Sequence, residues 1–270
     1  MSERNPIDGE FERLDETGKS AGPAQTPGFP VPPAPFKGAS QTVDAGACFD
    51  WLTQGWTMFI AHPGIWLGSS VLLLVCIMAI ALPPVFGQIA LHLLLPVFGA
   101  GMLQISRSIA EGKEPQIADL FAGFRHQAGQ LVMVGVFFAC GVFGIALFAM
   151  LLAGSGLIGG GMVGSIAGLS IALGSMLLTG LLVVILSTPV IMATWFAPAL
   201  VYFHDMPALE AMKASFAAGA KNWLVMIIFG ILLVIAAFFA LLPVGIGMLL
   251  LLPIASAAVY ASYRDIFPGA

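Results

Sequence analysis

The sequence predicts an all-α integral membrane protein in which six transmembrane helices form three hairpins, with short amphipathic helices at the cytoplasmic interface. The 10 Lys and Arg and the 14 Asp and Glu residues fall in four zones, which leave residues 51–106, 126–204 and 222–263 without a formal charge. Each charge-free stretch is long enough for two helical passes of about 20 residues. Hydrophobic residues make up 59% of the chain and charged residues only 9%, whereas a soluble protein is roughly a quarter charged.

Proline, glycine and the charged residues set the expected ends of the helices. The six expected helices cover about residues 65–82, 86–108, 131–152, 169–203, 223–242 and a last segment that ends at residue 263. The turns within the three pairs fall at Pro83 and Pro84, in a glycine-rich stretch, and at residues 243–245.

The distribution of Lys and Arg predicts the orientation of these helices. Cations lie only before the first helix, between the second and third, between the fourth and fifth, and after the sixth: Arg4, Arg13, Lys19, Lys37, Arg107, Lys113, Arg125, Lys213, Lys221 and Arg264. Because positively charged loops stay in the cytoplasm, we expect both termini to be cytoplasmic. All five tryptophans are expected toward this same side, as an interfacial aromatic belt.

The three hairpins resemble copies of one unit. The outgoing helix of each contains a proline, Pro96, Pro189 or Pro253, and ends in a polar exit. The exits read RSIAEGKEP at 107–115, YFHDMP at 202–207 and YRDIFP at 263–268.

A short amphipathic helix is predicted beside each hairpin. Pro115 and Pro207 are expected in the first turn of two of them, and Asp44 is expected to cap the one that precedes the first transmembrane helix. The three apolar stripes are Ile117, Leu120, Phe121 and Phe124; Leu209, Met212 and Phe216; and Cys48, Trp51, Leu52 and Phe59. We expect these stripes to lie in the headgroup zone of the membrane.

The chain divides into a tail and a membrane domain. Residues 1–42 are predicted to be a disordered, acidic, Pro/Gly-rich cytoplasmic tail, because this composition buries too little apolar surface to offset the entropy of ordering. The proline-rich part of the tail favours polyproline II, which suits a spacer or a ligand for an aromatic groove. Residues 43–270 form the predicted six-helix domain.

The sequence offers little catalytic chemistry. No catalytic triad, metal-ligand cluster or phosphate loop is recognisable, so we expect no enzyme activity, no cofactor and no metal. His92 is the one histidine expected at membrane depth, where hydrogen bonding to a nearby carbonyl and a functional role are both open. Four glycines at every fourth position, Gly156, Gly160, Gly164 and Gly168, are typical of close helix packing, either within one chain or between chains.

The polar and aromatic residues on the predicted cytoplasmic side form a candidate interaction face: Trp195, Pro198, Lys213, Lys221, Asn222, Trp223, Tyr263, Arg264 and Asp265. The expected contacts are the lipid bilayer and a membrane or cytoplasmic protein partner. An oligomer is compatible with the glycine pattern. The net charge of −4 gives no reason to expect nucleic acid.

Several short sequence motifs of the chain resemble those of an uncharacterised family of proteobacterial inner-membrane proteins. They are GKEP at 112–115, DLFAGF at 119–124, TWFAPALV at 194–201, AMKASF at 211–216, KNW at 221–223 and YASYRDIF at 260–267. More distantly, residues 45–268 are similar to the six-helix membrane domain attached to some glycerophosphodiester phosphodiesterases. The resemblance implies a multi-pass protein of the bacterial inner membrane and supplies no catalytic residue.

Two main functions follow as hypotheses. The first is a non-enzymatic scaffold that recruits partners through its cytoplasmic face. The alternative is a carrier or lipid-handling protein for uncharged or amphiphilic molecules, because proline-broken helices near a repeat interface often mark a binding site. A third hypothesis, an enzyme, requires residues from the interfacial layer, such as His204 with Asp205, to act on a lipid headgroup.

Overall fold

The computed structural model describes residue 36, residues 38–242 and residues 245–268, and within them all regular structure is helical. The predicted tail lies largely outside the described residues, which do not include 1–35 and 37. The elements are α1 (Ala47–Ala61), α2 (Pro63–Ala81), α3 (Phe86–Ala110), η1 (Ile117–Phe121), α4 (Ala122–Arg125), α5 (Ala128–Val163), α6 (Ile166–Trp195), α7 (Ala197–His204), α8 (Ala208–Lys221), α9 (Trp223–Leu241) and α10 (Met248–Ile266).

Six segments are long and apolar enough to cross a membrane, which confirms the predicted all-α membrane class. They are α2, α3, α5, α6 together with α7, α9 and α10, with mean hydropathies between 1.2 and 3.2. Their side chains remain largely uncovered by protein; Met162 is 84% exposed and Ile166 is 86% exposed. Soluble proteins rarely expose apolar surface on this scale, so lipid is the medium these helices suit.

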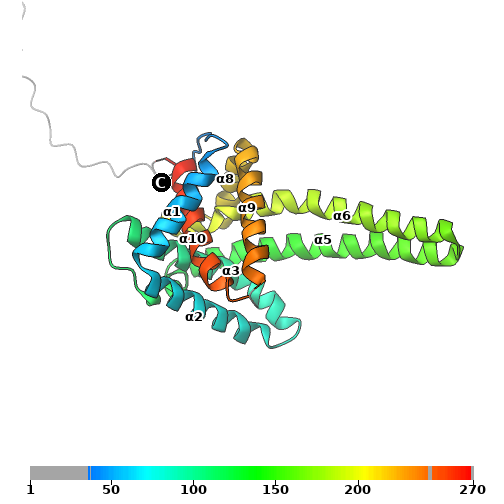
Figure 1. Ribbon diagram of the computed structural model, residues 1–270, viewed down its shortest axis with the longest axis horizontal. Coiled ribbons are helices and arrows are strands. Elements are labelled where there is room, and N and C mark those ends of the chain that lie inside the picture. Colours follow the sequence, from blue (N-terminus) through cyan, green and yellow to red (C-terminus); the bar gives the residue numbers. More distant parts are fainter. Residues whose placement is uncertain (1–35, 37, 243–244, 269–270) are drawn as a thin grey trace, which may run out of the picture. The chain divides into compact units, whose positions relative to one another are not determined.

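The protein core has two clusters of buried apolar residues. The larger lies where α1, α3, α5, α7, α8, α9 and α10 meet, and the smaller lies between α1, α2, α3, η1 and α10. Figure 1 shows α10 between α1 and α3, and α10 also contacts α2 and α9. Trp51 of α1 is buried in this core, where its ring packs edge-on against Phe229 of α9 at 5.3 Å between centroids. The indole Nε1–H of Trp51 donates a 2.9 Å hydrogen bond to the Asp265 carboxylate. The core therefore ties α1, α9 and α10 together.

The hairpin of α5 and α6 is longer than the sequence predicts. Figure 1 shows the two helices side by side over their whole length. The predicted helix ended at residue 152, but α5 continues through the glycine-rich stretch to Val163. At 1.5 Å per residue its 36 residues extend about 54 Å, whereas the hydrocarbon layer is about 30 Å thick. A perpendicular crossing therefore cannot accommodate the whole helix within hydrocarbon.

Glycines of the four-residue pattern pack α5 against α6 within one chain. A Cβ on Gly156 would collide with Ser175 of α6, and Gly160 and Gly168 face each other so closely that a Cβ on either would meet the carbonyl of the other. The fourth glycine of the pattern, Gly164, does not pack; it ends α5 with φ +61°. Glycine adopts this left-handed conformation at no steric cost, so Gly164 makes the turn.

The predicted helix over 169–203 is broken at Phe196, between α6 and α7. Pro198 has no N–H to donate and cannot continue the hydrogen-bond ladder. The buried Ser215 of α8 enters the break: its hydroxyl donates to the Met192 carbonyl at 2.7 Å and accepts from the Phe196 N–H at 3.0 Å. A serine from another helix thus bridges two backbone groups that a continuous helix would have paired.

The three predicted amphipathic helices differ in detail from expectation. Residues 117–125 form η1 and the one-turn α4, not a continuous α-helix. Gln116 is the N-cap of η1, and Pro115 therefore precedes the helix. Pro207 is likewise an N-cap with an extended ψ of 142°, not a first-turn residue. The N-cap of α1 is Gly46, not Asp44, so no side chain caps this helix.

The apolar stripes also separate into two kinds. Cys48, Trp51 and Phe59 of α1 are buried within the protein core. Leu209 and Phe216 of α8 are exposed instead, because α8 packs through its small residues, Ala208, Ala211, Ser215, Ala218 and Gly219. The stripe of η1 and α4 combines both kinds, because Leu120 is buried whereas Ile117 and Phe124 are exposed.

Candidate functional site

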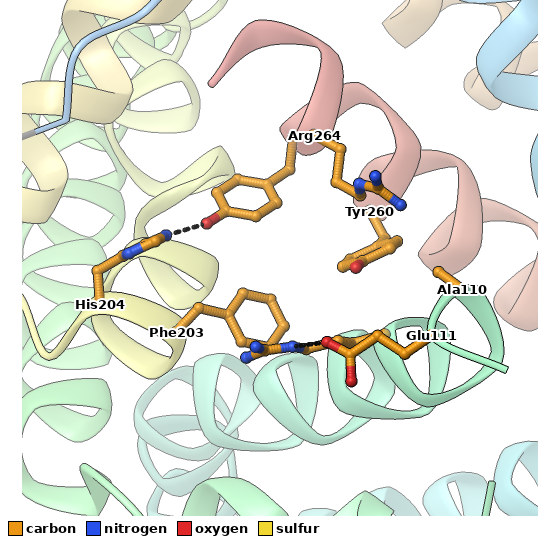
Figure 2. A pocket seen from close by; sticks show the side chains of 8 residues that line it. Ala110, Glu111, Phe203, His204, Tyr260 and Arg264 are labelled. Carbon is orange, nitrogen blue, oxygen red and sulfur yellow. Dashed lines mark hydrogen bonds and ion pairs between the residues drawn. The ribbon is translucent and has the colours of Figure 1, made fainter. Parts of the chain in front are cut away.

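The three polar exits of the repeated unit converge on one pocket. It has a cavity volume of about 250 Å³ and is lined by Arg107, Ala110, Glu111, Phe203, His204, Tyr260, Tyr263 and Arg264. Figure 2 shows these side chains coming from the ends of three helices around a common space. The helices are α3, α7 and α10, and the pocket lies at the C-terminal ends of three of the apolar segments. We call this the exit pocket.

Helical spacing places the lining residues on one face of each helix. Tyr260, Tyr263 and Arg264 stand at i, i+3 and i+4 in α10 and therefore share a face. Arg107 is in the last turn of α3, four residues before Glu111, the C-cap. Phe203 and His204 end α7, where Asp205 takes the left-handed conformation with φ +53° and turns the chain away.

The floor of the exit pocket is a fixed ion-pair cluster. The Arg107 Nε–H donates to the Glu111 carboxylate at 2.7 Å, and the Lys113 ammonium donates to the same carboxylate at 2.5 Å. These hydrogen bonds from Lys113 and Arg107 lower the pKa of Glu111 to about 2. Glu111 is therefore a carboxylate at neutral pH, and its charge is matched by two cations.

Aromatic rings form the walls. The Arg107 guanidinium lies over the Phe203 ring, 5.0 Å from its centroid, which is cation–π geometry. Tyr263 is buried, and its hydroxyl lies 2.5 Å from His204 Nε2. Figure 2 shows the Tyr260 ring across the space from Phe203, and the pocket lining also includes Tyr263.

A short N-terminal segment, Phe36 with residues 38–43, supports the pocket from outside; we call it the strap. The Gln41 N–H donates to the Ile266 carbonyl at 2.8 Å, and Asn222 binds the strap through the Val43 N–H and the Gln41 carbonyl, both at 2.9 Å. The Phe36 ring lies 4.4 Å from the His204 ring. The strap thus reaches the pocket wall, although the sequence places it in the disordered tail.

The residues of the predicted interaction face are not one surface. Tyr263 and Asn222 are buried, Trp195, Pro198 and Asp265 are half-buried, and Lys213, Lys221, Trp223 and Arg264 are exposed. Of these nine, Tyr263 and Arg264 line the exit pocket. The pocket residues that the predicted face omits are Arg107, Ala110, Glu111, Phe203, His204 and Tyr260. All of them except Tyr260 lie in the repeated polar exits, which is the sequence signal that points to them.

The histidines and carboxylates of the charged zones pair in ways the sequence does not indicate. Asp205 is bound by His126 at 2.8 Å and by the Gln127 side-chain amide at 2.6 Å, whereas His204 is bound to Tyr263. His204 and Asp205 therefore have different partners. His92 lies 2.6 Å from the Gln88 carbonyl through Nδ1. No metal-binding group of three or more ligands occurs among the residues that the structure describes.

The fold defines a multi-pass helical membrane protein. A protein of Burkholderia thailandensis described as a probable inner membrane protein is 28% identical over 228 residues, which are 81% of this chain and 82% of the relative. No family model matches the chain, and no solved structure matches it. The similarity agrees with the resemblance to inner-membrane proteins, whereas none of these comparisons shows a link to glycerophosphodiester phosphodiesterases.

Proposed function

We propose that this protein is a non-enzymatic inner-membrane protein that binds an amphiphilic molecule in the exit pocket. The pocket lies in the cytoplasmic leaflet, with both termini in the cytoplasm, since all the Lys and Arg residues occur in the zones that the positive-inside bias assigns to that side. The similarity to a probable inner membrane protein supports the choice of membrane.

The observation that carries the proposal is that the exit pocket combines aromatic walls with charged groups. Its walls include the aromatic rings of Phe203, Tyr260 and Tyr263, and its charged groups are Arg107, Glu111 and Arg264. Binding sites commonly combine an apolar lining with a few fixed polar groups. Because the helices that end here are apolar below the pocket, a ligand with a polar head and an apolar body fits both environments.

Site-specific photo-crosslinking tests this function. A photoreactive amino acid at position 260, in the pocket wall, should yield an adduct of lipid mass in intact cells. The matched control is position 235 in α9, an exposed apolar site outside the pocket. An adduct at 260 that differs from the control in identity or yield supports the proposal; the same adducts at both positions would refute it.

A second candidate is the recruitment scaffold, which one observation favours. Trp223 is 56% exposed beside the exposed Lys221, at the start of α9 and next to α8 with its exposed Leu209 and Phe216. Exposed Trp flanked by cations suits either the membrane interface or a partner protein. Crosslinking from position 223 separates these cases, because a protein adduct of defined mass supports the scaffold and a lipid adduct alone contradicts it.

A further inference from the structure

We propose that the exit pocket recognises a phosphate ester, held between Arg107 of α3 and Arg264 of α10. This inference rests on the proposed function and names the chemical class of its ligand. A lipid headgroup and a soluble phosphate ester present the same chemistry, and the experiment below separates the two sources.

The exit pocket is lined by more positive than negative groups. Two guanidinium groups line it, and the single lining carboxylate, Glu111, is already bound by Arg107 and by Lys113. Arg264 has no ion-pair partner among the residues that the structure describes. The cluster of Arg107, Lys113, Arg264 and Glu111 therefore carries excess positive charge, which an anionic ligand would offset.

Two contacts hold the Arg107 side chain in a fixed orientation. Its Nε–H is held by Glu111, and one face of its guanidinium lies against Phe203. No hydrogen bond from its terminal Nη groups to another described residue is present. A guanidinium fixed in this way loses little conformational freedom on binding, and its planar fork matches the oxygens of a carboxylate or a phosphate.

The arrangement of the donors around the cavity favours a phosphate over a carboxylate. The donors that line the cavity come from different helices: Arg107 belongs to α3, and Tyr260 and Arg264, seen in Figure 2, belong to α10. A carboxylate has two oxygens in one plane, and a single guanidinium fork satisfies both. A tetrahedral phosphate ester has additional oxygens in other directions and can accept hydrogen bonds from both helices at once.

The test uses the purified full-length chain and native mass spectrometry. The probes are phosphatidic acid, diacylglycerol with the same acyl chains, and glycerol 3-phosphate. We expect phosphatidic acid to bind and diacylglycerol to bind much more weakly. Arg264→Gln should weaken phosphatidic acid binding by about tenfold or more, because it removes charge-assisted hydrogen bonds. The matched control is Lys213→Gln, which removes an exposed cation from α8, outside the pocket.

Arg264→Lys provides a second variant that keeps the charge and loses the planar fork; we expect intermediate binding. Glycerol 3-phosphate binding as tightly as phosphatidic acid would support the phosphate chemistry and assign the source to a soluble ester. Equal binding of phosphatidic acid and diacylglycerol, unchanged in Arg264→Gln, would overturn this inference and leave the proposed function standing. If none of the three probes binds, both fail.

Discussion

At the scale of single residues, a few polar side chains complete the backbone where helices break or end. Ser215 is the clearest case, because its hydroxyl is shared between the Met192 carbonyl and the Phe196 N–H at the junction of α6 and α7. The site is buried, and a buried backbone group without a partner costs about 1–3 kcal/mol. Residues of this kind stabilise the bend that directs α7 toward the exit pocket.

Ser215→Ala should lower the free energy of unfolding by about 1–3 kcal/mol, since two backbone groups lose their shared partner. Ser170→Ala is the matched control: that exposed hydroxyl only bonds back to the Ile166 carbonyl within α6, so a change within about 0.5 kcal/mol is expected. Equilibrium unfolding in mixed micelles with increasing SDS measures both. Equal stabilities of the two variants would show that the bridge contributes nothing.

The ion pairs of Glu111 predict how the stability of the fold depends on pH. The pKa of Glu111 is lowered in the folded protein to about 2, by Lys113 first and then Arg107. A lowered pKa stabilises the fold above the carboxyl's unfolded value, and the contribution is lost as the pH falls toward 2. The difference in melting temperature between the wild type and Glu111→Gln should therefore be constant above about pH 5 and shrink below it. Because Glu111 is well exposed, high salt should also reduce the difference. A difference that is independent of pH would contradict this assignment.

At the scale of elements, close approach of backbones holds α5 and α6 together. Lipid offers no hydrophobic driving force for helix association, so small residues that allow tight packing take that role. Gly156, Gly160 and Gly168 lie in the contact, whereas a Cβ on Gly159 would meet nothing within 4 Å. Neighbouring glycines of one helix thus have opposite roles.

Gly160→Ala should destabilise the hairpin, by about 1–3 kcal/mol for an overpacked contact, because its Cβ would meet the Gly168 carbonyl. Gly159→Ala should instead be neutral or stabilise by up to about 1 kcal/mol, since alanine favours helix over glycine. Thermal unfolding of the two variants in the same detergent gives the comparison. Destabilisation by both substitutions to the same extent would indicate that helix contact is not the cause.

The strap is the second element with a testable role. Asn222 binds the Val43 N–H, the Gln41 carbonyl and the Ala218 carbonyl. Asn222→Ala should release the strap and raise hydrogen exchange at Val43 and its neighbours, because local openings require less free energy than global unfolding. Gln41→Ala keeps the backbone bonds and loses only the side-chain bond to the Asp265 carbonyl, so its effect should be smaller. If exchange is the same in both variants and the wild type, Asn222 does not hold the strap.

At the scale of the whole molecule, the charged residues predict one arrangement in the membrane. Lys113 lies at the pocket and Lys213 is exposed on α8, and both belong to zones that the positive-inside bias assigns to the cytoplasm. With this arrangement we expect the exit pocket to face the cytoplasmic leaflet and the proposed ligand to enter from that side.

An amine reagent that does not cross membranes should therefore label Lys213 only after the inner membrane is opened. Mass spectrometry of labelled peptides from spheroplasts, before and after permeabilisation, measures this, and a lysine introduced at Ser165 in the opposite turn serves as the positive control. Labelling of Lys213 in intact spheroplasts would show the reverse orientation.

The sequence predicted the class of fold well, because the rules that apply in a membrane are local. Long apolar stretches must form helices to pair their own backbone groups, and all six predicted segments appear as helices. The helix ends were less well predicted. Leu152 does not end α5, because packing of glycines against α6 sustains helix through a stretch that looks like a turn, and Asp44 is displaced as a cap by Gly46.

The sequence by itself determined the composition of this protein, the apolar segments, and the gathering of its charges in a few zones. Only the tertiary structure decided which polar residues meet. It buries Asn222 and Tyr263, gives His204 and Asp205 different partners, and brings Arg107 to the same cavity as Arg264, 157 positions later in the chain. The reason is physical. Helix formation depends on residues that are near in the sequence, whereas a pocket depends on how helix ends that are distant in the sequence pack together. A local sequence pattern does not specify that packing.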